Sequence, residues 1–144
     1  MLISTKGRYA LRVMLELAER ADGGEAVPLA SIAERQSISE KYLEGILAVL
    51  SKAGVVDGRR GKGGGYRLNR APGDYSVGEI LRLTEGSLAP VACLEGGRKK
   101  CARAGQCRTL PLWERLNELI CGYLDSVSLA DLAARADGCK NQLF

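Results

Sequence analysis

Residues 28–54, PLASIAERQSISEKYLEGILAVLSKAG, decide the fold of this chain. Proline is tolerated at a helix start, and the apolar residues that follow Pro28 predict a short helix of about two turns that breaks near Ser37. Ser39 is a favourable N-cap for a second helix, whose leucine and isoleucine residues share one face and which ends at Gly54. Two short helices joined by a tight polar turn are typical of a helix-turn-helix unit.

The segments on either side of this unit complete a winged helix. Upstream, apolar and small residues recur every three or four positions over residues 4–21, which predicts a helix capped by Ser4 or Thr5. Downstream, the residue pattern changes from helical to extended on both sides of a glycine-rich loop, so residues 55–57 and 66–68 predict a β-hairpin. A hairpin placed directly after a helix-turn-helix is a wing.

The rest of the chain predicts helices around one irregular stretch. Ser76 and Glu79 have the spacing of a capping box that opens a short helix. Residues 86–109 look irregular, and a long helix then begins around Thr109-Leu110-Pro111 and runs to residue 124. A last short helix begins at Ser128.

These elements define two expected units. The fold class is mainly α with a small β-hairpin wing, and residues 1–75 form a winged helix-turn-helix DNA-binding domain. Residues 76–144 hold the irregular cysteine-containing loop, the long helix and the C-terminal helix. The long helix has a wide apolar face with little chain left to cover it. That face is either buried within one chain or covered by a partner.

Composition places the chain among ordinary globular proteins and excludes several function classes. Its 144 residues suit one domain or one domain with an appendage, and 46% hydrophobic with 26% charged residues excludes a disordered chain. We expect a cytoplasmic protein, since no segment has the pattern of a signal peptide or a membrane span. The chain has no histidine, and no helix follows the glycines of residues 61–66 to make a nucleotide loop. An enzyme is therefore not expected.

The positive charge is concentrated in the predicted wing. The chain has 21 basic and 17 acidic residues, and residues 58–70 hold five of the basic ones and no acid. Such a basic stripe is typical of a surface that binds a phosphate backbone, although a solvated loop has the same composition. The helix-turn-helix in front of it favours the first interpretation.

Individual residues of the predicted interface have distinct hydrogen-bonding roles. The first residues of the second helix of a helix-turn-helix meet base edges in the major groove. There Lys41 can donate to guanine and Glu44 can accept from cytosine, while Ser39 and Tyr42 suit phosphates. Glu44 could instead be a helix-surface partner of Glu40 or Lys41. In the wing, the candidate DNA-binding residues are Arg59, Arg60, Lys62, Gly64 and Tyr66.

Three of the five cysteines, Cys93, Cys101 and Cys107, fall in the irregular stretch. Structural zinc prefers closer cysteine pairs, so it is a poor candidate. Thiolates on a glycine-containing loop can hold an iron–sulfur cluster, and the neighbouring lysines and arginines favour the ionised thiols. The alternative is a set of reactive or disulfide-forming thiols without iron. Cys121, in the middle of the long helix, is expected to be a buried apolar thiol, and Cys139 lies near the chain end.

Five motifs together resemble the Rrf2 family of bacterial winged-helix regulators. They are STKGRYALRVMLELA at 4–18, LASIAERQSISEKYLEGILAVLSKAGVV at 29–56, GRRGKGGGYRL at 58–68, VGEILRLTEG at 77–86 and SLADLA at 128–133. The resemblance implies a homodimer that binds palindromic promoter DNA, with the long helix crossing its twin. It also implies DNA contacts by Ser39, Tyr42 and Glu44 and entry of Arg60 into the minor groove, whereas Lys41 replaces a smaller polar residue.

Some members of this family hold an iron–sulfur cluster, and the resemblance implies a [2Fe–2S] cluster on Cys93, Cys101 and Cys107. The fourth ligand of those relatives, a histidine three residues past the last cysteine, is Leu110 here. A carboxylate, a hydroxyl, another cysteine or an exogenous thiol is then needed. We expect a regulator whose DNA binding is coupled to the cluster. The alternative is a cluster-free regulator of cysteine metabolism, controlled by thiol oxidation or by a partner enzyme of cysteine biosynthesis.

Overall fold

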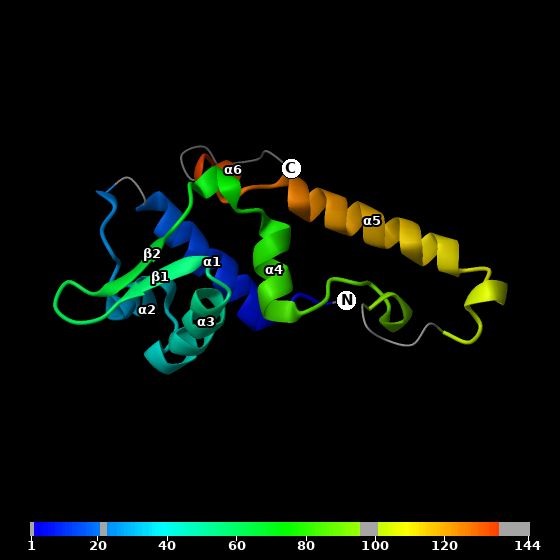
Figure 1. Cartoon of the computed structure of the whole chain (residues 1–144), viewed down its shortest axis with the longest axis horizontal. Coiled ribbons are helices and arrows are strands. Elements are labelled where there is room, and N and C mark those ends of the chain that lie inside the picture. Colours follow the sequence, from blue (N-terminus) through cyan, green and yellow to red (C-terminus); the bar gives the residue numbers. More distant parts are fainter. Residues whose placement is uncertain (1, 21–22, 96–100, 136–144) are drawn as a thin grey trace.

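A computed structural model describes residues 2–20, 23–95 and 101–135 of the chain. The described chain is mainly helical with a two-stranded antiparallel sheet, which confirms the expected fold class (Figure 1). Its helices and strands are, in chain order, α1 (Thr5–Glu19), α2 (Leu29–Gln36), α3 (Glu40–Lys52), β1 (Val56–Arg59), β2 (Gly65–Leu68), α4 (Val77–Glu85), α5 (Leu110–Ser126) and α6 (Leu129–Ala133).

Helices α1, α2 and α3 pack around one apolar core and form the predicted helix-turn-helix. The turn between α2 and α3 is sharp because Ser37 adopts a left-handed conformation with φ of 53°. The Ser39 hydroxyl then caps α3 by accepting from the Tyr42 N–H at 3.3 Å, as its place in the sequence predicts. Leu43 and Ile46 lie on the buried face of α3, so its opposite face is free for contacts outside the chain.

The wing, residues 56–68, is the predicted hairpin and is fixed at its base to the helical core. Strands β1 and β2 pair from Val56 opposite Leu68 to Arg59 opposite Gly65. The backbone of Tyr66 also exchanges two hydrogen bonds with Val27, at 2.8 and 2.9 Å. Gly65 is required there, because it has φ of 149° and a Cβ would collide with the Val27 carbonyl.

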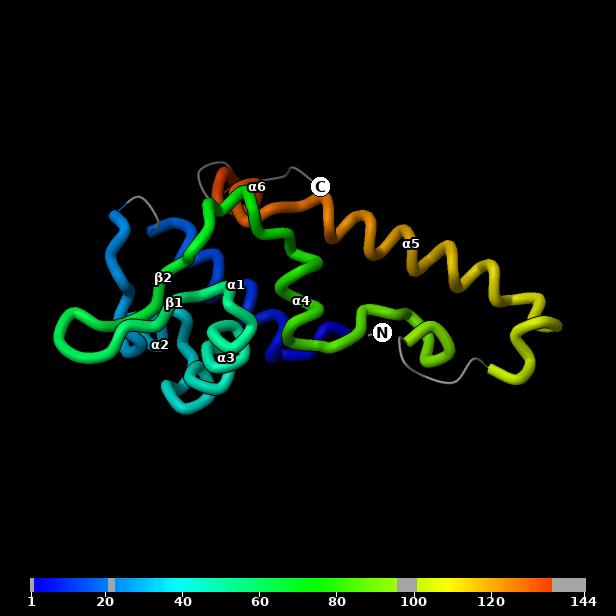
Figure 2. Tube along the Cα trace, viewed as in Figure 1, coloured from blue at the N-terminus to red at the C-terminus, as the bar shows by residue number. Residues whose placement is uncertain are grey.

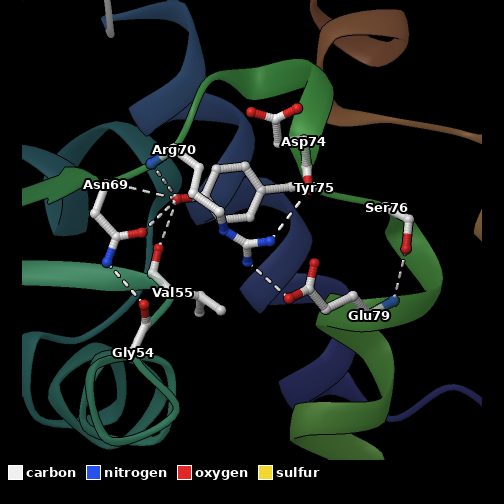
Figure 3. A network of polar contacts seen from close by, with 8 residues as sticks. All are labelled: Gly54, Val55, Asn69, Arg70, Asp74, Tyr75, Ser76 and Glu79. Carbon is white, nitrogen blue, oxygen red and sulfur yellow. Dashed lines mark hydrogen bonds and ion pairs between the residues drawn. The ribbon is translucent and has the colours of Figure 1, made fainter.

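Tyr75 joins the end of the wing to the helical core (Figure 3). Its ring is fully buried, and its hydroxyl oxygen accepts from the backbone N–H groups of Asn69 at 3.1 Å and Arg70 at 3.0 Å. The hydroxyl proton faces the Val55 carbonyl at 2.9 Å. The hydroxyl therefore holds the chain just before β1 and just after β2 together.

The start of α4 differs from the prediction in one respect. Ser76 caps the helix by accepting from the Glu79 N–H at 3.0 Å, but the reciprocal half of the expected capping box is absent. The Glu79 carboxylate instead accepts from Arg70 at 2.7 Å, and Arg70 stacks on the Tyr75 ring at 4.2 Å (Figure 3). A charge-assisted bond to a nearby arginine is stronger than a return bond to a backbone N–H, which explains the difference.

Helix α5 extends away from the winged helix, so that its first turn and the wing lie at opposite ends of the long axis (Figures 1 and 2). Arg82 of α4 and Asp125 near the end of α5 form a two-bonded ion pair at 2.6 and 2.8 Å, which fixes the direction of α5. Much of its apolar surface is uncovered, with exposed Leu112, Leu116, Leu119 and Tyr123.

Helix α6 returns to the winged helix and completes its core. Leu129 is fully buried among residues of α1, α3 and α4, and its N–H donates to the Tyr75 carbonyl at 3.0 Å. Residues on both sides of the expected boundary at residue 75 thus share one core. In the described ranges, the helices lack the length and apolarity needed to cross a bilayer. Cys139 lies outside the described residues.

Candidate functional site

The polar residues predicted to contact DNA from α3 all lie on its exposed side. Ser39, Lys41, Tyr42 and Glu44 are exposed at or near the first turn. Lys41 and Glu44 form no ion pair with any described residue, so both are free to meet a partner outside the chain. Because the Ser39 oxygen accepts the capping bond, its proton remains available to a phosphate oxygen.

Tyr42 is positioned by α1. Its ring is 41% exposed and packs edge-on against Tyr9, with 6.0 Å between the ring centres. The Arg12 guanidinium lies 5.1 Å from the centre of the Tyr9 ring, and it also donates to the Gln36 carbonyl at 2.6 Å. The packing against Tyr9 therefore holds the Tyr42 ring in place at the start of α3.

The basic residues of segment 58–70 fall into two groups. Arg67 pairs with Asp57 directly across the hairpin at 3.6 Å, and Arg70 pairs with Glu79 at 2.7 Å. The charge of these two arginines is balanced within the chain. Three exposed basic residues at the wing tip, by contrast, lack an acidic partner in the described parts of the chain: Arg59, Arg60 and Lys62.

The two remaining wing candidates, Gly64 and Tyr66, shape the hairpin. The Gly64 N–H donates to the Gly61 carbonyl at 2.9 Å, and a Cβ on Gly64 would lie 2.5 Å from the Arg59 carbonyl oxygen. Only glycine therefore permits this tip turn. The Tyr66 ring is half-buried and packs against the core, so less of it is offered to a partner than of Tyr42.

The three loop cysteines line one pocket at the first turn of α5. The pocket has a volume of about 240 Å³, and its walls include Cys93, Cys101, Cys107, Leu94, Leu110 and Glu114. The thiols stand around the pocket rather than around one point, since the described residues form no group of three or more Cys, Asp or Glu side chains that could hold a metal ion. Three soft sulfur donors with apolar neighbours in one pocket suit an iron–sulfur cluster, which shares its ligands between several irons.

The Cys107 thiol is ionised more readily than an ordinary cysteine. Its side-chain hydrogen bond with the Thr109 hydroxyl, at 3.4 Å, and backbone N–H groups at the start of α5 lower its pKa below the ordinary value of 9.0. A lowered pKa increases the fraction of thiolate, which is the form that binds metals.

The fourth cysteine of the described residues, Cys121, lies in α5 and outside the pocket. Cys121 is half-buried against the small apolar cluster of Val77, Leu81 and Leu88, so it packs as an apolar thiol although it is less buried than expected. Sequence reasoning did not single out Glu114, which follows Leu110 by four residues. That spacing places two residues on the same face of a helix, and it could have identified Glu114.

A helix-turn-helix with exposed polar residues at the start of its second helix, followed by a wing with three free basic side chains, defines a winged-helix DNA-binding protein. Residues 3–135 match the family described as "Rrf2: Iron-dependent Transcriptional regulator". The chain belongs to this Rrf2 family, and it is a transcriptional regulator rather than an enzyme.

Individual relatives point to the same class. The chain is 42% identical over 132 residues to the HTH-type transcriptional regulator IscR of Aliivibrio salmonicida, covering 92% of this chain and 77% of that protein. Its fold is similar to that of CymR, the global cysteine regulator of B. subtilis, with a TM-score of 0.75, 40% identity and coverage of 93% and 97% of the two chains. It is also similar to T. potens IscR, with a TM-score of 0.73, 40% identity and coverage of 99% and 94%.

Proposed function

We propose that this regulator binds palindromic promoter DNA as a homodimer in the cytoplasm, and that an iron–sulfur cluster on Cys93, Cys101 and Cys107 controls its binding. The observation that carries the proposal is that these three cysteines line one pocket. The similarity to regulators named IscR supports it.

The DNA contacts are assigned from exposure and pairing. Lys41 and Glu44 read base edges in the major groove, while the Ser39 and Tyr42 hydroxyls bind phosphates beside it. Arg60 enters the minor groove, where a narrow groove concentrates negative potential. Arg59 and Lys62 bind phosphates, and Gly64 and Tyr66 keep the tip in the shape that these contacts need.

The homodimer is assigned from the uncovered face of α5. Leu112, Leu116, Leu119 and Tyr123 follow one another at spacings of four, three and four, which is the repeat of helices that pack side by side. Their side chains are between 37% and 59% exposed, an unusual amount of apolar surface for one helix. A second copy of α5 covers this face and places two recognition helices on one side of the dimer.

The cysteine loop is connected to both ends of this assembly. The loop begins after α4 and ends at the first turn of α5. In α4, Ile80 packs in the core of the winged helix, and Val77 packs in the cluster between α4 and α5. When bound, the cluster would supply a redox-active centre. With and without it, Cys93, Cys101 and Cys107 would hold the loop differently, and this would change the spacing of the two recognition helices.

The test is an absorption spectrum of protein made without oxygen, measured beside the Cys107→Ala variant. We expect visible charge-transfer bands in the wild type, together with bound iron and sulfide, and a loss of these bands in the variant. A colourless wild type that cannot be reconstituted with iron and sulfide would contradict the cluster.

A second candidate function is favoured by the similarity to CymR. In it the same dimer regulates cysteine metabolism without iron, and the signal is oxidation of the loop thiols or a partner enzyme of cysteine biosynthesis. The low pKa of Cys107 suits such thiol chemistry as well. A colourless protein whose DNA affinity changes with peroxide would support this second function.

A further inference from the structure

Glu114 lies in the wall of the cysteine pocket, and we infer that its carboxylate is the fourth ligand of the cluster. This inference rests on the proposed cluster and deepens it, because three thiols alone leave one ligand position of the set open. It assigns a defined donor to a position that no histidine can fill in this chain.

The helix geometry brings Glu114 to the right place. Leu110, in the first turn of α5, lines the pocket but has a hydrocarbon side chain that cannot bind a metal. Glu114 is four residues further along, so it lies on the same face of the helix one turn deeper. Its longer side chain can reach back towards the helix start, which is the direction in which helical side chains point.

Glu114 is also the free carboxylate of its helix. The structure describes α5 from end to end, and the other two acids on it are paired: Glu118 with Arg115 at 2.9 Å and Asp125 with Arg82 at 2.6 Å. Glu114 forms no hydrogen bond or ion pair with the described residues. Its carboxylate therefore remains available to a ligand in the pocket that it lines.

The other protein donors considered from the sequence are less suitable. The nearest hydroxyl, that of Thr109, is already bonded to the Cys107 sulfur at 3.4 Å. Cys121 lies about two turns further along α5 than Glu114, packs against the apolar cluster of Val77, Leu81 and Leu88, and does not line the pocket. A carboxylate also suits ferric iron, which accepts oxygen donors as well as thiolates.

This donor set has a measurable consequence. Three thiolates and one carboxylate give the cluster the same total charge as four thiolates, whereas a histidine ligand would make it less negative by one. Since reduction potential depends on cluster charge, the midpoint potential should be lower than with a histidine ligand. It should also lack the pH dependence that protonation of a ligand imidazole would cause.

The test compares four full-length proteins made and reconstituted without oxygen: the wild type, Glu114→Ala, Glu114→Cys and the control Glu118→Gln. We expect Glu114→Ala to lose its cluster to a chelator about tenfold faster or more, and to change the electron paramagnetic resonance of what remains. Glu114→Cys should keep its iron and sulfide and shift its visible bands, because one oxygen donor becomes sulfur. Glu118→Gln should match the wild type, and circular dichroism confirms that all four are folded.

Two outcomes overturn the inference, and they are distinguishable. If the wild type holds a cluster and Glu114→Ala matches it in iron, sulfide, visible bands and magnetic resonance, then another group such as an exogenous thiol is the fourth ligand, and the proposed function stands. If the wild type binds no iron and sulfide, the proposed function and this inference both fail.

Discussion

At the scale of single residues, the wing tip holds basic side chains that have no acidic partner in the described chain and can contact a nucleic acid. Five basic residues in residues 58–70 suggested one continuous basic stripe, but Arg67 and Arg70 are paired with acids. The sequence could predict the location of the stripe and not this division, because Asp57 and Glu79 flank the segment outside residues 58–70. We therefore expect electrostatic binding to DNA to depend on Arg59, Arg60 and Lys62, which are exposed.

Replacing Arg60 by alanine should weaken operator binding by about 1–3 kcal/mol, because a groove contact is lost. Arg115→Ala, on the exposed surface of α5, is the matched control and should leave binding unchanged. Fluorescence anisotropy with a DNA duplex selected by the protein from a random pool measures both. An unchanged titration for Arg60→Ala would remove the wing from the mechanism.

Replacing Lys62 by alanine should reduce the salt dependence of DNA binding. Each phosphate contact contributes about −0.9 to the slope of log affinity against log salt concentration, so the variant should lose about that much per protomer. Titrations at several salt concentrations give the slope. The same slope in wild type and variant would mean that Lys62 contacts solvent only.

Replacing Tyr75 by phenylalanine should destabilise the protein by about 1–3 kcal/mol, because the hydroxyl satisfies two backbone N–H groups and one carbonyl near the core. Urea unfolding measures the difference. Tyr66→Phe is the control and should change little, since the Tyr66 hydroxyl has no hydrogen-bond partner among the described residues. Equal losses in the two variants would refute the role assigned to the Tyr75 hydroxyl.

At the scale of elements, the sequence predicted the helices and the hairpin well, because periodicity and caps are local signals. Ser4, Ser39 and Ser76 cap helices where expected. Contacts between elements were not predictable in this way. Glu16 is only 5% exposed on α1, where it accepts from Gln36 at 2.6 Å, and the pattern of α1 alone does not reveal that α2 supplies this partner.

The joint between α4 and α5 should weaken in acid. The hydrogen bonds from Arg82 hold the pKa of Asp125 below its ordinary value of 3.8. Because the folded pKa is the lower one, the pair contributes its full stability above 3.8 and loses it as the pH falls further. Asp125→Asn should be less stable at neutral pH and should lose less stability on acidification, as measured by urea unfolding at a series of pH values. Parallel pH profiles for the two proteins would contradict this account of the joint.

At the scale of the whole molecule, the apolar face of α5 is evidence for a second chain. Replacing Leu116 by lysine at the centre of this face should convert the proposed dimer to a monomer, because a charge cannot be buried there without a partner. Light scattering after gel filtration gives the mass directly, and Glu118→Gln on the same helix should remain dimeric. A Leu116→Lys protein with the mass of two chains would place the interface elsewhere.

The wing and the first turn of α5 lie at opposite ends of the long axis (Figure 1), and the cysteine pocket is at that first turn. Coupling between the wing and the pocket within one chain therefore passes through α4 and α5. The sequence predicted that the three cysteines belong to one loop, but only the fold shows that they share a pocket with Glu114. We therefore expect the state of the pocket to set the affinity of the distant DNA-binding surface for DNA.

The most direct measurement is the DNA affinity of one preparation before and after its cluster is removed without oxygen, using the same selected duplex and the Cys107→Ala variant as the cluster-free reference. We predict that removal changes the dissociation constant about tenfold or more, within the usual range of coupling free energies, and makes the wild type match Cys107→Ala. Equal dissociation constants for the cluster-bound and cluster-free forms would contradict the account, even if the protein binds both iron and DNA.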